Sequence, residues 1–161
     1  MGAFNKCTKL TSIVIPDSIT TINPSTFAAC TNLTSISIPN SVVKIGGYAF
    51  YECKNLSSIT IPDSVTSIDY WAFKNCSKLT SITIPKNVTE LSGSAFDGCY
   101  RLTTLFLPKS IKTIDYKYGF SFTIDTIYCE TQEVADLITG YEHFDSVKSY
   151  LDIIVDASMF S

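Results

Sequence analysis

The sequence predicts a solenoid, a fold in which short units of one repeated pattern stack and bury each other's apolar faces. Three residue types recur at a fixed interval of 23 positions along most of the chain. They are the cysteines Cys7, Cys30, Cys53, Cys76 and Cys99, the phenylalanines Phe4, Phe27, Phe50, Phe73 and Phe96, and the prolines Pro16, Pro39, Pro62, Pro85 and Pro108. A strict period of this length is typical of stacked repeats and not of a chain built from independent elements.

Each unit is predicted to contribute one strand. In the unit around residues 49–62, Leu56, Ile59 and Ile61 face inward, and apolar and polar residues alternate at the end of the segment, as in a half-buried strand. Pro62 ends this strand because proline cannot donate a hydrogen bond to a neighbouring strand. Stacking the units therefore gives a parallel sheet on one face, with strands about 4.8 Å apart.

The rest of each unit returns the chain to the start of the next strand. Val65 and Ile68 bring an apolar edge back to the core. Ala72, Phe73 and Cys76 then suit a single helical or 3-10 turn on the side opposite the sheet. The phenylalanine and cysteine columns should form a buried ladder there, in which each phenylalanine contributes about 1.5–3 kcal/mol of burial free energy.

The repeats divide the chain into two regions of a single domain. Residues 1–119 hold five units, of which the first is incomplete, and residues 120–161 form a C-terminal capping region. The capping region should contain a sixth strand at residues 124–129 and a helix that starts at Thr131, ends at Gly140 and carries one apolar stripe (Val134, Leu137, Ile138, Tyr141). A second short helix at residues 146–151 and an apolar run at residues 153–155 follow.

The repeated string Ser-Ile-Thr-Ile-Pro-x-Ser-Val-x-x-Ile-x-x-x-Ala-Phe-x-x-Cys-x-x-Leu resembles the BspA-like leucine-rich-repeat family, over about residues 3–114. The resemblance implies a leucine-rich-repeat solenoid, a right-handed superhelix of the α/β class. It has a parallel β-sheet on one face and short helical or 3-10 turns and loops on the other. It also implies a cell-surface or secreted protein associated with adhesion to host proteins and to other cells. The family has no common catalytic residues, so the resemblance carries none over to this chain.

Composition and charge exclude several classes of partner. Residues 1–119 carry a net charge of +4 and residues 120–161 a net charge of −7, and neither contains a basic run that would follow a nucleic-acid backbone. No stretch approaches the length of about 18 apolar residues needed to span a bilayer, so membrane insertion is not expected. The start has no signal-peptide pattern and falls inside a repeat, so we expect a piece cut from a longer protein, and a cytoplasmic location stays an alternative.

The sequence offers no catalytic, cofactor or metal site. His143 is the only histidine, and no nucleophile–base pair or phosphate-binding loop is present. Asp125, Glu130, Glu133 and Asp136 lack the spacing of a calcium loop and are expected to form a solvated face. Five cysteines share one repeat position, and cysteines 23 positions apart do not match a zinc motif. We expect them to be buried free thiols.

The best candidate for a binding site is a group of aromatic residues. Tyr48 and Trp71 occupy one repeat column, and Tyr51 and Tyr70 lie close to them in sequence. On neighbouring coils these rings should form a patch on an edge of the solenoid, and exposed tyrosine and tryptophan are typical anchors for a protein ligand. The alternative is that the rings fold over the core and fill space between loops.

Outward positions of the strands form a second candidate surface, which is rich in hydroxyl groups. Its residues are Ser35, Ser37, Ser58, Thr60, Ser81, Thr83 and Phe106. Such a lattice could bind glycans, although small hydroxyl residues also simply suit an exposed strand.

The functional hypothesis is a non-enzymatic protein-interaction module whose ligand is a protein, such as a host extracellular-matrix or surface protein. The alternative is an intracellular scaffold or regulatory subunit, which the free cysteines would suit. A further expectation is a homo-oligomer formed through the exposed N-terminal edge.

Overall fold

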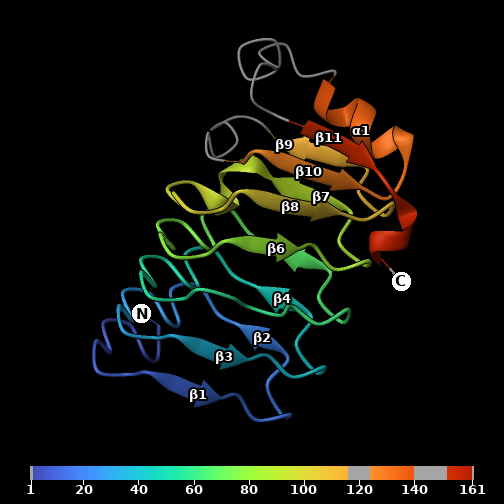
Figure 1. Cartoon of the computed structure of the whole chain (residues 1–161). Coiled ribbons are helices and arrows are strands. Elements are labelled where there is room, and N and C mark those ends of the chain that lie inside the picture. The colour runs from blue at the N-terminus through green and yellow to red at the C-terminus, as the bar shows by residue number, and fades with distance from the viewer. Residues whose placement is uncertain (1, 116–123, 140–151, 161) are drawn as a thin grey trace.

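The computed structural model describes residues 2–115, 124–139 and 152–160. Successive coils of the chain stack along one axis, and the colour in Figure 1 passes from blue to red as the stack grows. Most coils contribute short parallel strands to two faces, and the apolar core lies between them. The predicted solenoid with a parallel sheet is confirmed.

The first face, here called the strand face, contains the strands that the repeat pattern predicted and one that it did not. The predicted strands are β1 (Ser12–Val14), β3 (Ser35–Ser37), β6 (Ser81–Thr83), β8 (Thr104–Leu107) and β10 (Thr126–Cys129). The additional strand is β11 (Asp152–Val155), which includes the apolar run at residues 153–155 and pairs with β10. Their register follows the repeat, since Ile13 lies opposite Ile36, and Ile82 lies opposite Leu105. The coil at residues 58–60 joins this face only through a single bridge between Ser37 and Thr60.

A second face is built from shorter strands, which the sequence did not reveal as strands. They are β2 (Thr21–Ile22), β4 (Lys44–Ile45), β5 (Ser67–Ile68), β7 (Glu90–Ser92) and β9 (Thr113–Asp115). The ladder β2–β4–β5 and the ladder β7–β9 are separate, so the hydrogen-bonded pairing is interrupted between β5 and β7. Each of these strands has a single inward apolar residue, such as Ile22 in β2 or Ile45 in β4, so no alternation of inward residues could be read and the pattern gave only an apolar edge here.

The edge that carries the phenylalanines, here called the turn edge, consists mainly of hydrogen-bonded turns. Only one 3-10 helix, η1 (Gly93–Phe96), lies in the described repeats. In three coils the expected helical turn is replaced because two positions adopt left-handed backbone angles, such as Tyr48 (φ 58°) with Glu52 (φ 57°), and Trp71 (φ 56°) with Asn75 (φ 63°). Residues at positive φ do not continue a right-handed helix.

Two buried ladders fill the core beneath the turn edge. The rings of Phe4, Phe27, Phe50, Phe73 and Phe96 stack nearly parallel, with centroids 5.2–5.8 Å apart. The thiols of Cys30, Cys53, Cys76 and Cys99 each donate to the carbonyl of the phenylalanine that lies 26 residues earlier, at 3.1–3.2 Å. All six cysteines are free. Of the five in the repeat column, Cys30, Cys53, Cys76 and Cys99 are buried as predicted, whereas Cys7 at the N-terminal end of the column is half-buried. Burial raises the pKa of the Cys53 thiol to about 12.

The C-terminal region closes the described stack. Strand β10 is the predicted sixth strand, and Cys129 lies opposite Leu107 as expected. Helix α1 (Gln132–Thr139) buries Val134, Ala135 and Ile138, and η3 (Ala157–Phe160) follows β11. The predicted helix at residues 146–151, the stripe residue Tyr141 and His143 lie outside the described residues. No described helix has the length and apolar character to cross a bilayer.

Candidate functional site

The structure brings the four predicted aromatic residues together on the turn edge, in an arrangement here called the aromatic cluster (Tyr48, Tyr51, Tyr70, Trp71). The Tyr48 ring is central, with its centroid 5.7 Å from Tyr51, 6.0 Å from Tyr70 and 5.1 Å from Trp71. Tyr70 and Trp71 also meet edge to face at 5.2 Å. Edge-to-face pairs at these distances are favourable, so the rings hold one another in place.

The cluster is partly exposed. Tyr70 is 53% exposed, and the other three side chains are half-buried. Tyr48 and Trp71 stand at positive φ, where a bulky residue costs roughly 1–2 kcal/mol relative to ordinary backbone angles. Ser25, in the same repeat column, also has φ 59°, so the conformation is shared by three successive coils and does not depend on an aromatic side chain. Contacts among the rings offset part of this cost and fix the direction in which the rings project.

Charged side chains border the cluster next to Trp71. The ammonium group of Lys74 lies 5.4 Å from the Trp71 ring centroid, a cation–π distance, and 2.7 Å from a carboxylate oxygen of Asp97. The hydrogen bond to Asp97 raises the pKa of Lys74, so the lysine is charged at neutral pH. A hydrogen bond with Glu52 raises the pKa of the Tyr51 hydroxyl, so this tyrosine stays neutral.

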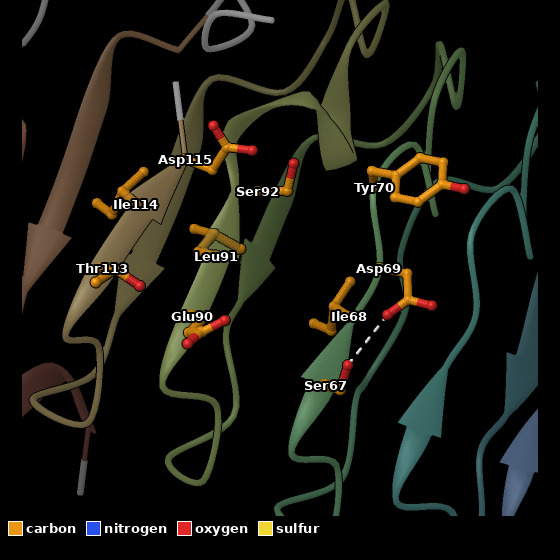
Figure 2. Close-up of a pocket in the computed structure, with 10 residues that line it drawn as sticks. All are labelled: Ser67, Ile68, Asp69, Tyr70, Glu90, Leu91, Ser92, Thr113, Ile114 and Asp115. Atoms are coloured by element: carbon orange, nitrogen blue, oxygen red, sulfur yellow. Dashed lines mark hydrogen bonds between the residues drawn. The ribbon is translucent and has the colours of Figure 1, made fainter. Parts of the chain in front are cut away.

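Next to Tyr70, a pocket of about 420 Å³ lies where the second face is interrupted between β5 and β7 (Figure 2). Tyr70 lines its border, and Asp69, Glu90 and Asp115 contribute carboxylates. Asp69 accepts a hydrogen bond from the Ser67 hydroxyl at 3.2 Å and pairs with Lys44 at 3.1 Å. The aromatic cluster therefore adjoins an acidic hollow at Tyr70 and the Lys74 ammonium group at Trp71.

The residues of the alternative surface on the strand face differ in how far they are exposed. Ser35, Ser37, Ser58, Thr60, Ser81 and Thr83 are all exposed. Phe106 is instead half-buried, because its ring stacks on Tyr128 at 4.9 Å and meets the edge of Phe160 at 6.3 Å. The hydroxyl rows thus end against an aromatic group contributed by β8, β10 and η3.

The described residues contain no group of three or more His, Cys, Asp or Glu side chains placed to hold a metal ion. The acidic residues of the capping region differ in environment. Glu130 is not part of a solvated face as predicted, since its side chain is only 15% exposed and its carboxylate lies 3.0 Å from the Lys109 ammonium group. Asp125, Glu133 and Asp136 are exposed.

The N-terminal edge is formed by β1, which pairs with β3 on one side only. Val14 on this strand is 81% exposed, and a hollow of about 380 Å³ with a mainly apolar lining lies beside it. The association of a second copy at this edge stays a prediction.

Comparison with known families agrees with the geometry. The pattern described as "BspA type Leucine rich repeat region" matches residues 1–124 in six copies, one more than the five units counted above. The chain belongs to the BspA-type leucine-rich-repeat family. A search of curated proteins found no match.

Several solved structures resemble this BspA-type chain. A leucine-rich cell-surface protein of Faecalibacterium prausnitzii is 30% identical, with a TM-score of 0.70 over 75% of this chain and 32% of its own. The T. pallidum leucine-rich repeat protein is 23% identical, with a TM-score of 0.74 over 96% of this chain and 78% of its own. The pneumococcal vaccine antigen PcpA is 21% identical, with a TM-score of 0.65 over 91% of this chain and 41% of its own. The chain thus spans well under half of the first and third proteins, and the second and third likenesses show the fold alone.

Family membership places the chain among folds that generally act as non-enzymatic protein-interaction modules. Sequence reasoning found the four rings of the aromatic cluster but missed Lys74, Asp69 and Glu90, which border them. The repeat register could have located these residues. Lys74 follows Trp71 by three positions. Glu90 occupies the same repeat column as Ser67, on the coil after the one that carries Ser67 and Asp69.

Proposed function

We propose that this chain is the protein-interaction module of a cell-surface or secreted adhesion protein, and that the aromatic cluster is the surface that contacts the partner. The observation that carries the proposal is the cluster itself, four rings gathered on one edge with Tyr70 53% exposed. Tyrosine and tryptophan are the side chains that most often anchor protein interfaces. The cell-surface likeness at 30% identity supports the location.

The chemistry around the cluster suits a protein ligand. The rings supply apolar contact area, Lys74 supplies a cation next to Trp71, and Asp69 and Glu90 supply carboxylates in the pocket next to Tyr70. A partner that carries an apolar side chain flanked by a basic and an acidic residue would match all three features. Host extracellular-matrix and surface proteins are the class in which we expect to find it.

The test uses a double variant that leaves the backbone unstrained. Tyr70→Ala removes the exposed ring, and Trp71→Asn removes the second ring with a residue that tolerates positive φ. We would measure binding of the wild type and the variant to immobilised collagen, laminin and vitronectin by biolayer interferometry. Loss of two anchor side chains should weaken binding by a factor of about ten or more.

A matched control keeps the test specific. Ser35→Ala with Ser81→Ala alters two exposed residues of the strand face and should leave binding unchanged. Equal binding by the wild type and the cluster variant to every matrix protein that binds would refute the role of the cluster.

A second candidate is an intracellular scaffold, which the six free cysteines favour, because reduced thiols persist in a reducing compartment. Protease treatment of intact source cells separates the two locations. Digestion of the protein while cytosolic proteins survive supports a surface location, whereas complete protection supports the scaffold.

A further inference from the structure

A second cavity lies at the loops that follow the strands, on a different edge of the coil from the aromatic cluster. We call it the coil-end pocket, and it is lined by parts of the loops after β6 and β8, by Asp63 and Glu130, and by Met159 and Phe160 of η3. Its volume is about 730 Å³, within the range of small-molecule sites and larger than the hollow beside Tyr70. In Figure 1, η3 lies beside the carboxyl ends of the strand-face arrows.

The walls of the coil-end pocket are fixed by contacts between successive coils. Lys86 pairs with Asp63 at 2.8 Å, and the Asn87 side-chain amide donates to the Asp63 carbonyl at 2.6 Å. Lys109 contacts the Glu130 carboxylate through two groups. Its ammonium group lies 3.0 Å from one carboxylate oxygen, and its backbone N–H donates to the other at 2.9 Å. The pocket therefore exists only when three coils and the C-terminal segment are assembled.

The charge of the pocket is positive although the whole chain carries −3. Lys86, Lys109 and Lys112 line it, against the two carboxylates of Asp63 and Glu130. Among the described residues, Lys112 forms no ion pair. An ammonium group has three N–H donors, so Lys86 and Lys109 also keep donors beyond the one that meets a carboxylate. The lining can accept one further negative charge.

The remaining wall of the pocket is aromatic and apolar. The Phe160 ring meets the edge of Phe106 at 6.3 Å, and Phe106 in turn stacks on Tyr128 at 4.9 Å, so Phe160 is backed by two rings. Met159 beside it is 46% exposed. An apolar ring facing a set of hydrogen-bond donors matches a ligand with one apolar face and several polar groups at its rim.

From these features we propose that the coil-end pocket binds a carboxylated sugar ring, of the kind found in acidic glycans. The C–H face of a pyranose packs against Phe160, its hydroxyl groups meet Asn87, Ser110 and Glu130, and its carboxylate is neutralised by Lys112. A neutral sugar carries no negative charge that could pair with the Lys112 ammonium group. A long acidic peptide or a nucleic acid would satisfy the lysines but not the single aromatic wall.

The test titrates the whole chain with glucuronic acid and with glucose, two pyranoses that differ in the carboxylate, using ligand-observed NMR. We expect saturable binding of glucuronic acid that is about tenfold tighter than that of glucose, because one charge-assisted contact is added. Lys112→Gln should weaken glucuronic acid binding about tenfold and leave glucose binding nearly unchanged. Lys78→Gln, which alters an exposed lysine on the turn edge, is the matched control and should have no effect.

Phe160→Ala should weaken both sugars, and its melting temperature shows whether the fold survives the loss of the ring contact. Absence of saturable binding, or equal affinity for the two sugars with no response to Lys112→Gln, would overturn the proposal. Tighter binding of a poly-glutamate peptide or an oligonucleotide at the same lysines would assign the pocket to another anion and would likewise overturn it. Neither Tyr70 nor Trp71 lines this pocket, so the result is independent of the aromatic cluster.

Discussion

The stacked phenylalanines make a prediction that depends on position in the ladder. Phe50 is completely buried and stacks on Phe27 at 5.5 Å and on Phe73 at 5.2 Å. Phe4 is half-buried and stacks on Phe27 alone among the described rings, at 5.4 Å. Replacing either residue by leucine keeps an apolar side chain and removes the ring contacts. At about 0.5–1.5 kcal/mol per aromatic pair, Phe50→Leu should lose about 1–3 kcal/mol of unfolding free energy and Phe4→Leu about half as much.

Urea denaturation followed by far-ultraviolet circular dichroism measures both losses on the same scale. The slope of free energy against urea should stay constant, so that the shift in midpoint reports stability. Phe73→Leu, which has two stacked neighbours, should match Phe50→Leu. Equal losses for Phe4→Leu and Phe50→Leu would refute the reasoning, because the number of ring neighbours would then not decide the cost.

Three further predictions concern other features of the coils. The backbone and side-chain hydrogen bonds from Lys109 lower the pKa of Glu130, so the stability that Glu130 adds is complete above its ordinary pKa and is lost as the pH falls through the lowered value. The stability difference between the wild type and Glu130→Gln in denaturation curves should therefore be largest near pH 7 and vanish in acid, and a difference that grows on acidification would contradict this. Because burial raises the pKa of Cys53 to about 12, iodoacetamide should label the half-buried Cys7 well before Cys53 in the folded protein, as read by mass spectrometry, and equal rates would be inconsistent with a closed core. Ala29 has φ 57°, so Ala29→Gly should raise the urea midpoint by relieving roughly 1 kcal/mol of strain, whereas Ala28→Gly, at an ordinary backbone angle, should lower it.

The repeat period predicted the fold because most of its stability comes from identical contacts between neighbouring coils. The Phe50 and Cys53 columns, and the inward isoleucines of the strand face, could be placed from their spacing alone. The second face could not, since a strand such as β4 has only two residues. The left-handed positions were only partly marked, because Asn75 and Gly98 favour positive φ, whereas Ala29 and Glu52 in the same repeat column do not.

The two candidate sites also differ in whether the repeat pattern could predict them. The aromatic cluster was predictable because Tyr48 and Trp71 share one column of the repeat. The coil-end pocket was not, because Met159 and Phe160 lie beyond the repeats and no period relates them to Lys86 or Lys109. Contacts between a repeat and a segment that does not follow it require the folded structure.

The most direct measurement of the central claim is site-specific photocrosslinking from the aromatic cluster. A photoreactive phenylalanine analogue would replace Tyr70, or Ser81 on the strand face as the control, and the protein would be irradiated on intact host cells with their matrix. The account predicts that position 70 captures one or a few extracellular or surface proteins that position 81 does not. Capture of the same proteins from both positions, or of none from position 70 while the wild-type protein binds the cells, would contradict it.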